Sequence, residues 1–424
     1  MGALNGFHHH AKLENGVNFD RASAIENAVR VLLQGLGEDI NREGLINTPL
    51  RVARAFTEGT RGYKEDPYEI VEAALFSESN NNGESNSGGL VVVRDIDLFS
   101  YCDSCLLPFQ VKCHIGYLPL GGKVLGLSKL ARVAQTFSKR LQNPQKLADQ
   151  ICASLDRGIE PRGVAVVLQC SHLQNRNPRW IEAMVSAGCG AFERGGDVAW
   201  ADFFGVLKFR GINVDDSAAK DRRKWCPSAE MEPSSSDPAL ALAVSTIIHS
   251  LGEDPTRKEL VETPTRFLNW LLQFKNTKFN LKMSNNGLPS SPENGYSSKE
   301  RKVCCELSLP FLSQCEHHLL PFQGVVHIGY YGTGSMSAAT KSAVESVVHH
   351  FGFKLQLQER LTRQIAETVS SVLGDDVMTV VEATHTCMIA RGVEKLGSST
   401  VTIAVLGRFS VDPAAREEFL MMIP

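Results

Sequence analysis

The chain has 424 residues, of which 43% are apolar and 21% charged, and its formal net charge is -3. This length exceeds what one hydrophobic core usually supports, so we expect two domains. The average composition excludes a disordered, collagen-like or membrane protein, and the small net charge excludes a general attraction to nucleic acid or anionic lipid. Any anion site must therefore be a local cluster of Lys and Arg residues.

The N-terminal segment predicts a cytoplasmic protein. It contains no uninterrupted apolar run of the kind found in signal peptides, and the acidic Glu14 and Asp20 argue against a transit peptide. In a chain without a secretion signal, the eleven cysteines indicate reduced thiols rather than a disulfide framework. Some of these thiols are candidate metal ligands.

The chain is a diverged tandem repeat. The sequence Leu-Gly-Glu-Asp at 36–39 recurs at 251–254, and His-Ile-Gly-Tyr at 114–117 recurs at 327–330. A polar stretch rich in Ser, Pro and charged residues separates the two copies, as expected for a linker. The repeat predicts a first domain, a linker and a second domain over these ranges: 1–214, 215–238 and 239–424.

In chain order, each copy of the repeat predicts the elements α-α-β-β-α-α-β-β. An apolar stripe at helical spacing begins at Ile25, and Thr48 followed by Pro49 is a typical start of a second helix. The clearest later strands are expected at 90–93, 111–117, 164–168 and 377–389, and helices at 128–140 and 358–373. This segregated order favours an α+β fold with antiparallel sheets over a doubly wound parallel sheet.

The second copy carries the strongest group of candidate metal ligands. Cys-Glu-His-His at 315–318 precedes a predicted strand, and His-Thr-Cys at 385–387 lies near the end of another. Strand alternation predicts that His385 and Cys387 share one face while the neighbouring threonines point away. Three Cys or His ligands with an open fourth position are typical of catalytic zinc. A closed structural site or a pair of buried cysteines is the alternative, and two separated clusters favour a metal site.

These motifs resemble GTP cyclohydrolase I. The similarity rests on Cys-Glu-His-His-Leu-Leu-Pro-Phe at 315–322, Leu-Gln-Leu-Gln-Glu-Arg-Leu-Thr at 355–362 and Glu-Ala-Thr-His-Thr-Cys-Met at 382–388. It spans nearly all of the second copy. The resemblance implies two tandem T-fold domains, each an antiparallel sheet with helices on one side, with zinc as the cofactor and GTP as the substrate.

The resemblance also implies roles for single residues of the second copy. The positions that match the family's zinc ligands are Cys315, His318 and Cys387. The positions that match its purine and proton-transfer residues are His317 and His385. The positions that match its guanine contacts are Gln358 and Glu359, and Arg391, a basic residue found only in this copy, is also expected to bind the substrate. For Glu359, the residues alone favour a first-turn carboxylate paired with Arg363.

The first copy resembles the same family at 48–54 and 126–132, but its zinc motif is expected to be lost. Cys-Asp-Ser-Cys stands at 102–105, and the expected counterparts of His385 and Cys387 are Ser171 and Leu173. The positions that match triphosphate contacts are Arg51, Arg54, Lys129 and Arg132. The last two lie on the opening turn of a helix, where positive charge opposes the helix dipole unless an anion binds there. An ordinary solvated basic face is the alternative.

The second copy shows the opposite loss. Ala343, Ser346 and Asn269 stand at the positions of Lys129, Arg132 and Arg54. Because family sites are assembled from neighbouring subunits, this complementary loss implies composite sites and resembles the plant-type enzyme. Alternation of the two kinds of domain favours an even homo-oligomer, such as a dimer of chains.

The reaction implied by the resemblance is GTP plus water giving 7,8-dihydroneopterin triphosphate and formate, the first step toward tetrahydrofolate. Zinc would activate the water that attacks C8, and His385 would transfer protons. Ser128 and Ser342 both match a serine near the ribose, and Ser128 is favoured because it precedes Lys129. The alternatives are a non-catalytic GTP- or pterin-binding scaffold and an enzyme in which only the second copy works.

Overall fold

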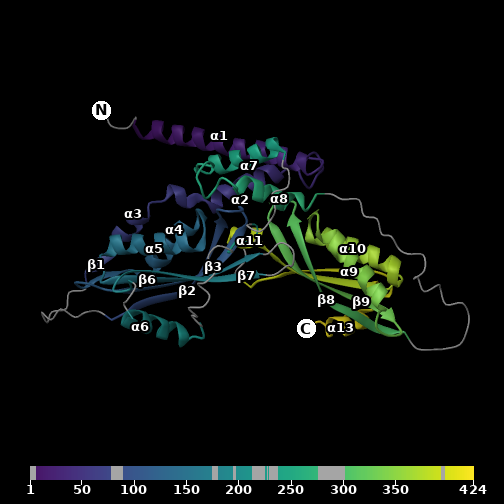
Figure 1. Cartoon of the computed structure of the whole chain (residues 1–424). Coiled ribbons are helices and arrows are strands. Elements are labelled where there is room, and N and C mark those ends of the chain that lie inside the picture. The colour runs from purple at the N-terminus through teal and green to yellow at the C-terminus, as the bar shows by residue number, and fades with distance from the viewer. Residues whose placement is uncertain are drawn as a thin grey trace, which may run out of the picture. The chain divides into compact units, whose positions relative to one another are not determined.

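A computed structural model of the chain describes residues 6–77, 89–173, 180–193, 197–212, 225–226, 228, 237–275, 301–392 and 397–424. These residues pack as two compact units (Figure 1). Unit 1 takes the described residues within 1–32, 49–270 and 389–396, and unit 2 takes those within 33–48, 271–388 and 397–424. The units interleave along the chain, so they differ from the halves of the sequence repeat. The domain boundaries at 214 and 239 remain a prediction about that repeat.

Residues 6–212 contain the sheet of unit 1. Their helices are α1 (Gly6–Gly35), α2 (Thr48–Gly59), the 3-10 helix η1 (Arg61–Lys64), α3 (Pro67–Glu72), α4 (Leu127–Ser138), α5 (Pro144–Ile159) and α6 (Asp197–Lys208). Their strands are β1 (Leu75–Ser77), β2 (Val91–Cys102), β3 (Pro108–Leu118), β4 (Lys123–Leu125), β5 (Leu141–Gln142), β6 (Gly163–Leu173) and β7 (Trp180–Gly190). The main sheet has the order β5-β2-β3-β6-β7, and β1 pairs separately with β4.

Residues 237–424 repeat the pattern and contain the sheet of unit 2. Their helices are α7 (Pro238–Ser250), α8 (Thr263–Leu272), α9 (Ala338–Gly352), α10 (Gln358–Leu373), α11 (Thr386–Ala390), α12 (Arg408–Val411) and α13 (Pro413–Leu420). Their strands are β8 (Lys302–Cys315), β9 (Pro321–Gly332), β10 (Leu355–Gln356), β11 (Val377–His385) and β12 (Thr400–Val405). The sheet order is β10-β8-β9-β11-β12, which matches that of unit 1.

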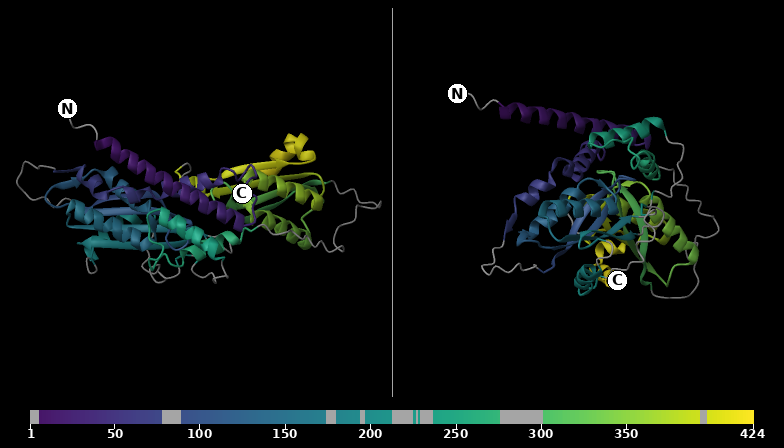
Figure 2. Two further views of the ribbon diagram at one scale, coloured as in Figure 1. Left: turned by 90° about the horizontal axis from the view of Figure 1, so that it is seen from above. Right: turned by 60° about the vertical axis from the view of Figure 1, so that its left-hand side comes forward.

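The predicted α+β fold is confirmed. The long strands of each sheet pair antiparallel, and the two-residue strands β5 and β10 add a short parallel edge. Two long helices cover one face of each sheet, α4 with α5 and α9 with α10 (Figures 1 and 2). Among the described helices, none combines the length and the apolar character needed to cross a bilayer.

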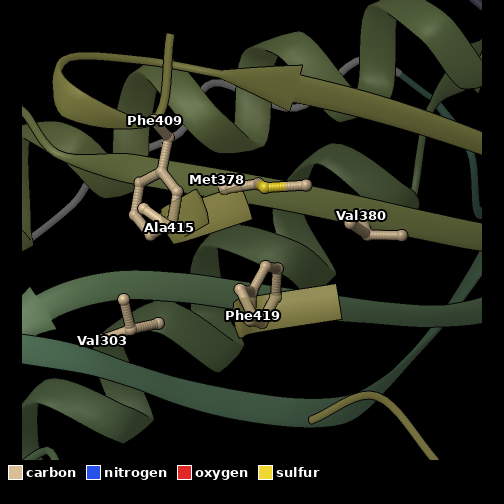
Figure 3. Close-up of a cluster of buried hydrophobic side chains, with 6 residues drawn as sticks. All are labelled: Val303, Met378, Val380, Phe409, Ala415 and Phe419. Atoms are coloured by element: carbon tan, nitrogen blue, oxygen red, sulfur yellow. The ribbon is translucent and has the colours of Figure 1, made fainter. Parts of the chain in front are cut away.

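A helix packs on the opposite face of each sheet, α6 in unit 1 and α13 in unit 2. In unit 2, Phe419 of α13 belongs to a buried cluster with strand residues such as Met378 and Val380 (Figure 3). The glycines of the repeated His-Ile-Gly-Tyr sequence permit this packing. A Cβ atom on Gly329 would lie 2.7 Å from the Phe419 ring, and one on Gly116 would lie 2.8 Å from the Phe203 ring of α6. The glycine therefore recurs because an aromatic ring contacts the strand backbone at that position.

The histidines of the same repeated sequence have a structural role. A bulge in β2 places Asp95 at φ 58°, and a bulge in β8 places Ser308 at φ 59°. The backbone N–H groups of these two residues donate to Nδ1 of His114 and of His327, each at 3.2 Å. Burial lowers the pKa of both histidines, which favours the neutral ring that can accept this bond.

We expect His114→Ala to lower the free energy of unfolding by about 0.5–1.5 kcal/mol, because the bulge loses a hydrogen bond. Urea-induced unfolding at pH 8 measures this change, and His249→Ala on an exposed helix face is the control. The folded-state pKa of His114 is depressed, so its stabilisation is present above about pH 6.5 and is lost as the pH falls toward the folded-state pKa. A variant as stable as wild type at pH 8 would contradict this role.

Candidate metal centre

The Cys-Glu-His-His sequence forms a tight turn between β8 and β9. Cys315 is the last residue of β8, and its backbone N–H donates to the Leu320 carbonyl at 2.9 Å. The Leu319 N–H donates back to the Cys315 carbonyl at 2.9 Å, and Leu319 adopts φ 50°. This left-handed residue reverses the chain within a few residues. The reversal brings His318 Nδ1 to 3.7 Å from Cys315 Sγ.

Cys387 reaches this turn from a helix rather than from a strand. The strand expected over 377–389 ends at His385, and α11 begins at Thr386. The alternation argument is therefore wrong, and Thr386 is buried and donates to the Pro321 carbonyl at 2.6 Å instead of pointing away. The next partner in the β9–β11 register would be Pro321, which has no N–H to continue the ladder.

The three predicted zinc ligands nevertheless lie together. Ligand atoms of Cys315, His318 and Cys387 are all within 4.8 Å of one another. Both cysteines are buried and His318 is half-buried. Hydrogen bonds from Cys387 and His318 hold the pKa of the Cys315 thiol well below its usual value. Two soft thiolates and one imidazole fit zinc, and a set of three protein ligands leaves a fourth coordination position for water or substrate.

Glu316 anchors the turn, a role that the motif alone did not reveal. Its side chain is fully buried and forms two hydrogen bonds with Arg360, at 2.7 and 2.9 Å, and one with Arg42 at 2.7 Å. The Thr48 hydroxyl donates to the Glu316 carbonyl at 2.7 Å. Burial opposes ionisation, but the two guanidinium groups outweigh it and hold the pKa of Glu316 below its usual value. The only sequence signal for this anchor is an acidic residue between two candidate ligands.

His385 lies beside the ligand cluster in a fixed orientation. Its Nε2 lies 2.7 Å from Gln358 Oε1, and its ring stacks on Phe322 with a centroid distance of 4.5 Å. The Gln358 amide nitrogen donates to the carbonyls of Val381 and Thr400, at 3.0 and 2.8 Å. Gln358 is buried, so its side chain binds protein groups here, and its predicted contact with guanine remains a prediction.

The other candidates of the second copy lie closer to solvent. His317 is half-buried, and its ring centroid is 6.2 Å from that of His318. Glu359 is exposed on the first turn of α10. Arg363 pairs with Glu367 at 3.9 Å in the described chain, so the structure does not support its expected pairing with Glu359. Arg391 is exposed directly after α11.

The candidate phosphate-binding residues lie on two helices of unit 1. Arg51 and Arg54 are on α2, and Ser128, Lys129 and Arg132 are on the N-terminal part of α4. Lys129 and Arg51 are half-buried and the others are exposed. Gly126 at the N-cap of α4 provides no side-chain hydrogen bond to the first turn. Backbone N–H groups and cationic side chains are thus combined at one helix end, which suits an anion.

The assignment of Ser171 and Leu173 as the counterparts of His385 and Cys387 is wrong by one residue. In the β9–β11 register His385 lies opposite Phe322, and in the β3–β6 register His172 lies opposite Phe109. Both residues of the first pair are 213 positions after those of the second. The true counterpart of His385 is therefore His172. A shift of one residue along a strand moves a side chain to the other face of the sheet, so this difference changes the chemistry assigned to the first copy.

The fold and the ligand cluster define a duplicated α+β protein with a site suited to a metal-dependent enzyme. Comparison with known proteins gives its family: residues 25–184 and 240–424 match GTP cyclohydrolase I. The chain belongs to the GTP cyclohydrolase I family of enzymes. Both copies of the repeat are included in the match, as the sequence predicted.

Similar proteins from plants align over nearly the whole chain. A GTP cyclohydrolase 1 from Solanum lycopersicum is 53% identical, and the alignment covers 100% of this chain and 98% of that protein. A GTP cyclohydrolase 1 from Arabidopsis thaliana is 52% identical, with 94% and 89% covered. One from Dictyostelium discoideum is 40% identical and covers 45% of this chain and 80% of its own length. The full-length matches therefore share the tandem length, whereas the Dictyostelium protein aligns with less than half of the chain.

We expect Glu316→Gln to destabilise unit 2 by about 2–3 kcal/mol, because two partly buried guanidinium groups lose their carboxylate. Denaturant unfolding measures the loss, and Glu367→Gln, which removes one exposed ion pair, is the matched control. Because the folded-state pKa of Glu316 is depressed, the difference should be largest above about pH 4.3 and shrink as the pH falls through that pKa. Equal losses in the two variants would contradict the anchoring role.

Proposed function

We propose that this chain is a zinc-dependent GTP cyclohydrolase I that converts GTP and water to 7,8-dihydroneopterin triphosphate and formate. The observation that carries the proposal is the cluster of Cys315, His318 and Cys387, with His385 held beside it by Gln358 and Phe322. Family membership and the names of the two plant relatives support the same activity. This reaction would begin tetrahydrofolate biosynthesis.

The ligand cluster suits a catalytic rather than a purely structural metal. A zinc ion held by Cys315, His318 and Cys387 would act as a Lewis acid that activates water for attack on C8 of the purine. The buried ion pairs of Glu316 keep the turn in place, so the ligands need little rearrangement when the metal binds. His317 lies on the same turn, where it is proposed to act on the purine.

His385 is proposed to transfer protons during ring opening and formate release. Both N–H groups of the Gln358 amide donate to carbonyls, so Gln358 Oε1 can only accept a hydrogen bond from the N–H of His385 Nε2. A neutral His385 therefore carries its proton at Nε2, and its other ring nitrogen is free of a proton and can accept one. The Phe322 ring holds the imidazole plane. Gln358 thus positions the imidazole of His385 as a general base. This role does not depend on a contact between Gln358 and the substrate.

The substrate is proposed to bind residues of both copies. Glu359 and Arg391 are both exposed in this structure. They are assigned to binding the guanine of GTP and the part of the substrate next to it. The triphosphate is assigned to cationic side chains of a first copy, with Ser128 near the ribose: Arg51, Arg54, Lys129 and Arg132. Each site would then combine zinc ligands of a second copy with phosphate-binding residues of a first copy. We also propose that the chains form an even homo-oligomer, of which a dimer is the simplest case. The protein is proposed to be cytoplasmic and to have neither a nucleic acid nor a membrane as a partner.

We expect Cys387→Ser to lose zinc and turnover together, because a site with three protein ligands does not readily replace one. His385→Ala should keep zinc and lose ring opening, since its role is proton transfer. Zinc is measured by mass spectrometry, and turnover by the fluorescence of the oxidised pterin. The exposed His249→Ala is the control for both measurements. Full turnover in zinc-free protein would overturn the mechanism, and tight GTP binding without any pterin in wild type would favour the scaffold.

We expect Lys129→Ala and Arg132→Ala each to reduce kcat/KM for GTP roughly 10- to 150-fold, because a charge-assisted contact to phosphate contributes about 1.5–3 kcal/mol. Zinc content should not change. Lys123→Ala, which removes a cation paired with Glu160 in the same unit, should have normal kinetics and serves as the control. Normal kinetics in the Lys129 and Arg132 variants would limit the first copy to a supporting role.

Mixing the two kinds of inactive chain tests whether sites are composite. After subunit exchange, a Cys387→Ser chain and a Lys129→Ala chain should together recover part of the activity, since each supplies the half that the other lacks. Light scattering on the same samples gives the number of chains. An active assembly with an odd number of chains would contradict the even arrangement.

A further inference from the structure

A second cluster of potential metal ligands lies in unit 1, at residues that the proposed function does not use. It consists of Cys102, Cys105, His172 and Cys226. All four residues are buried, and one ligand atom from each lies within 4.8 Å of the others. The three cysteines form no disulfide. Three soft sulfur atoms and one imidazole nitrogen in a buried space are the donor set of a structural zinc site.

The turn that carries two of these ligands is the counterpart of the turn described above. The Cys102 N–H donates to the Leu107 carbonyl at 2.9 Å, and the Leu106 N–H donates to the Cys102 carbonyl at 2.9 Å. Leu106 adopts φ 57°, close to the φ 50° of Leu319 in the other turn. Cys102 and Cys105 thus stand where the second copy has Cys315 and His318. A cysteine in place of a histidine preserves the ability of this turn to bind a metal.

The fourth ligand differs between the two copies because of one residue. His385 is bonded through Nε2 to Gln358, whereas the first residue of the matching helix α5 is Pro144, which has no side-chain amide. His172 instead places Nε2 3.3 Å from Cys105 Sγ, and its Nδ1 lies 3.3 Å from the Leu173 carbonyl. A proton on Nδ1 satisfies that carbonyl and leaves the Nε2 lone pair for a metal. The histidine therefore fills the position that stays open in the second copy.

Cys226 takes the place that Cys387 has in the other cluster. The preceding residue, Trp225, packs edge-on against Phe109 and His172, with centroid distances of 5.1 and 5.3 Å. Both Trp225 and Cys226 are buried, although they fall within the range expected to be a polar linker. These contacts hold the Cys226 thiol against the sheet, so its position does not depend on the metal alone.

The surroundings favour a cation over three free thiols. Cys102, Cys105 and Cys226 are all buried, and their sulfur atoms lie within 4.8 Å of one another. A buried thiolate without a cation is costly, and a divalent ion offsets this cost by converting all three thiols to thiolates with release of their protons.

We propose that the first copy of the repeat binds a structural zinc ion through Cys102, Cys105, His172 and Cys226. The four ligands close the tetrahedral shell, so the ion offers no position for water or substrate and takes no part in turnover. It ties the segment at Trp225–Cys226 to the β2–β3 turn and to β6. The divergence of the first copy has thus changed a catalytic metal site into a closed one, and this inference does not depend on GTP being the substrate.

Metal analysis of the full-length protein tests the proposal. We expect wild type, purified without chelator and dialysed against metal-free buffer, to contain two zinc ions per chain. Cys226→Ala and Cys315→Ala should each contain one, and the double variant none. Cys170→Ala removes an equally buried thiol of β6 that lies outside the cluster, and it should keep both ions. A zinc content that is the same in Cys226→Ala as in wild type would overturn the proposal, whatever the result for Cys315→Ala.

A second measurement covers the case in which Cys226→Ala fails to fold. X-ray absorption at the zinc edge of the Cys315→Ala protein, where only the proposed site remains, should show three sulfur ligands at about 2.3 Å and one nitrogen at about 2.0–2.1 Å. Cys226→His should keep zinc and change the ratio to two and two. An absence of zinc from folded Cys315→Ala protein, or a disulfide among these cysteines in wild type isolated without oxidant, would refute the site.

Discussion

The buried carboxylate of Glu316 is the constraint on which the candidate metal centre of the second copy depends. It pairs with Arg360 of α10 and with Arg42, which is 274 residues away in the sequence, and so fixes the turn between two candidate ligands. A threonine from the other copy of the repeat completes each turn. Thr48 donates to the Glu316 carbonyl, and Thr263 donates to the Asp103 carbonyl at 2.6 Å. These exchanged contacts explain why the packing units interleave along the chain.

The two turns have one backbone geometry and two chemistries. Both begin at a cysteine, contain a left-handed leucine and place a second candidate ligand three residues after the first. In the second copy Gln358 holds the neighbouring histidine away from the ligand set, which leaves that set open. In the first copy Pro144 releases the histidine, which then approaches the cysteines. A single side chain at a helix N-terminus therefore separates a site suited to catalysis from one suited to structure.

The recurring histidine of the β3 and β9 strands shows that a repeated polar residue need not be catalytic. His114 and His327 each accept a hydrogen bond from a bulge in the neighbouring strand, and burial keeps both rings neutral. Their recurrence reflects the same backbone irregularity in both sheets. The histidines that differ in their partners, His172 and His385, are the ones whose chemistry has diverged.

The sequence by itself determined the features that depend on local periodicity and local motifs: the tandem repeat, the α+β class, the exact limits of helix α10 and the three zinc-ligand candidates of the second copy. Only the tertiary structure decided that β11 ends at His385, because the missing N–H of Pro321 belongs to a neighbouring strand. Sheet register likewise identified His172, and packing brought Cys226 to residues more than fifty positions away in the sequence. The partners of Glu316 were also hidden, because a buried charge is paired by groups that are distant in the chain and leave no local pattern.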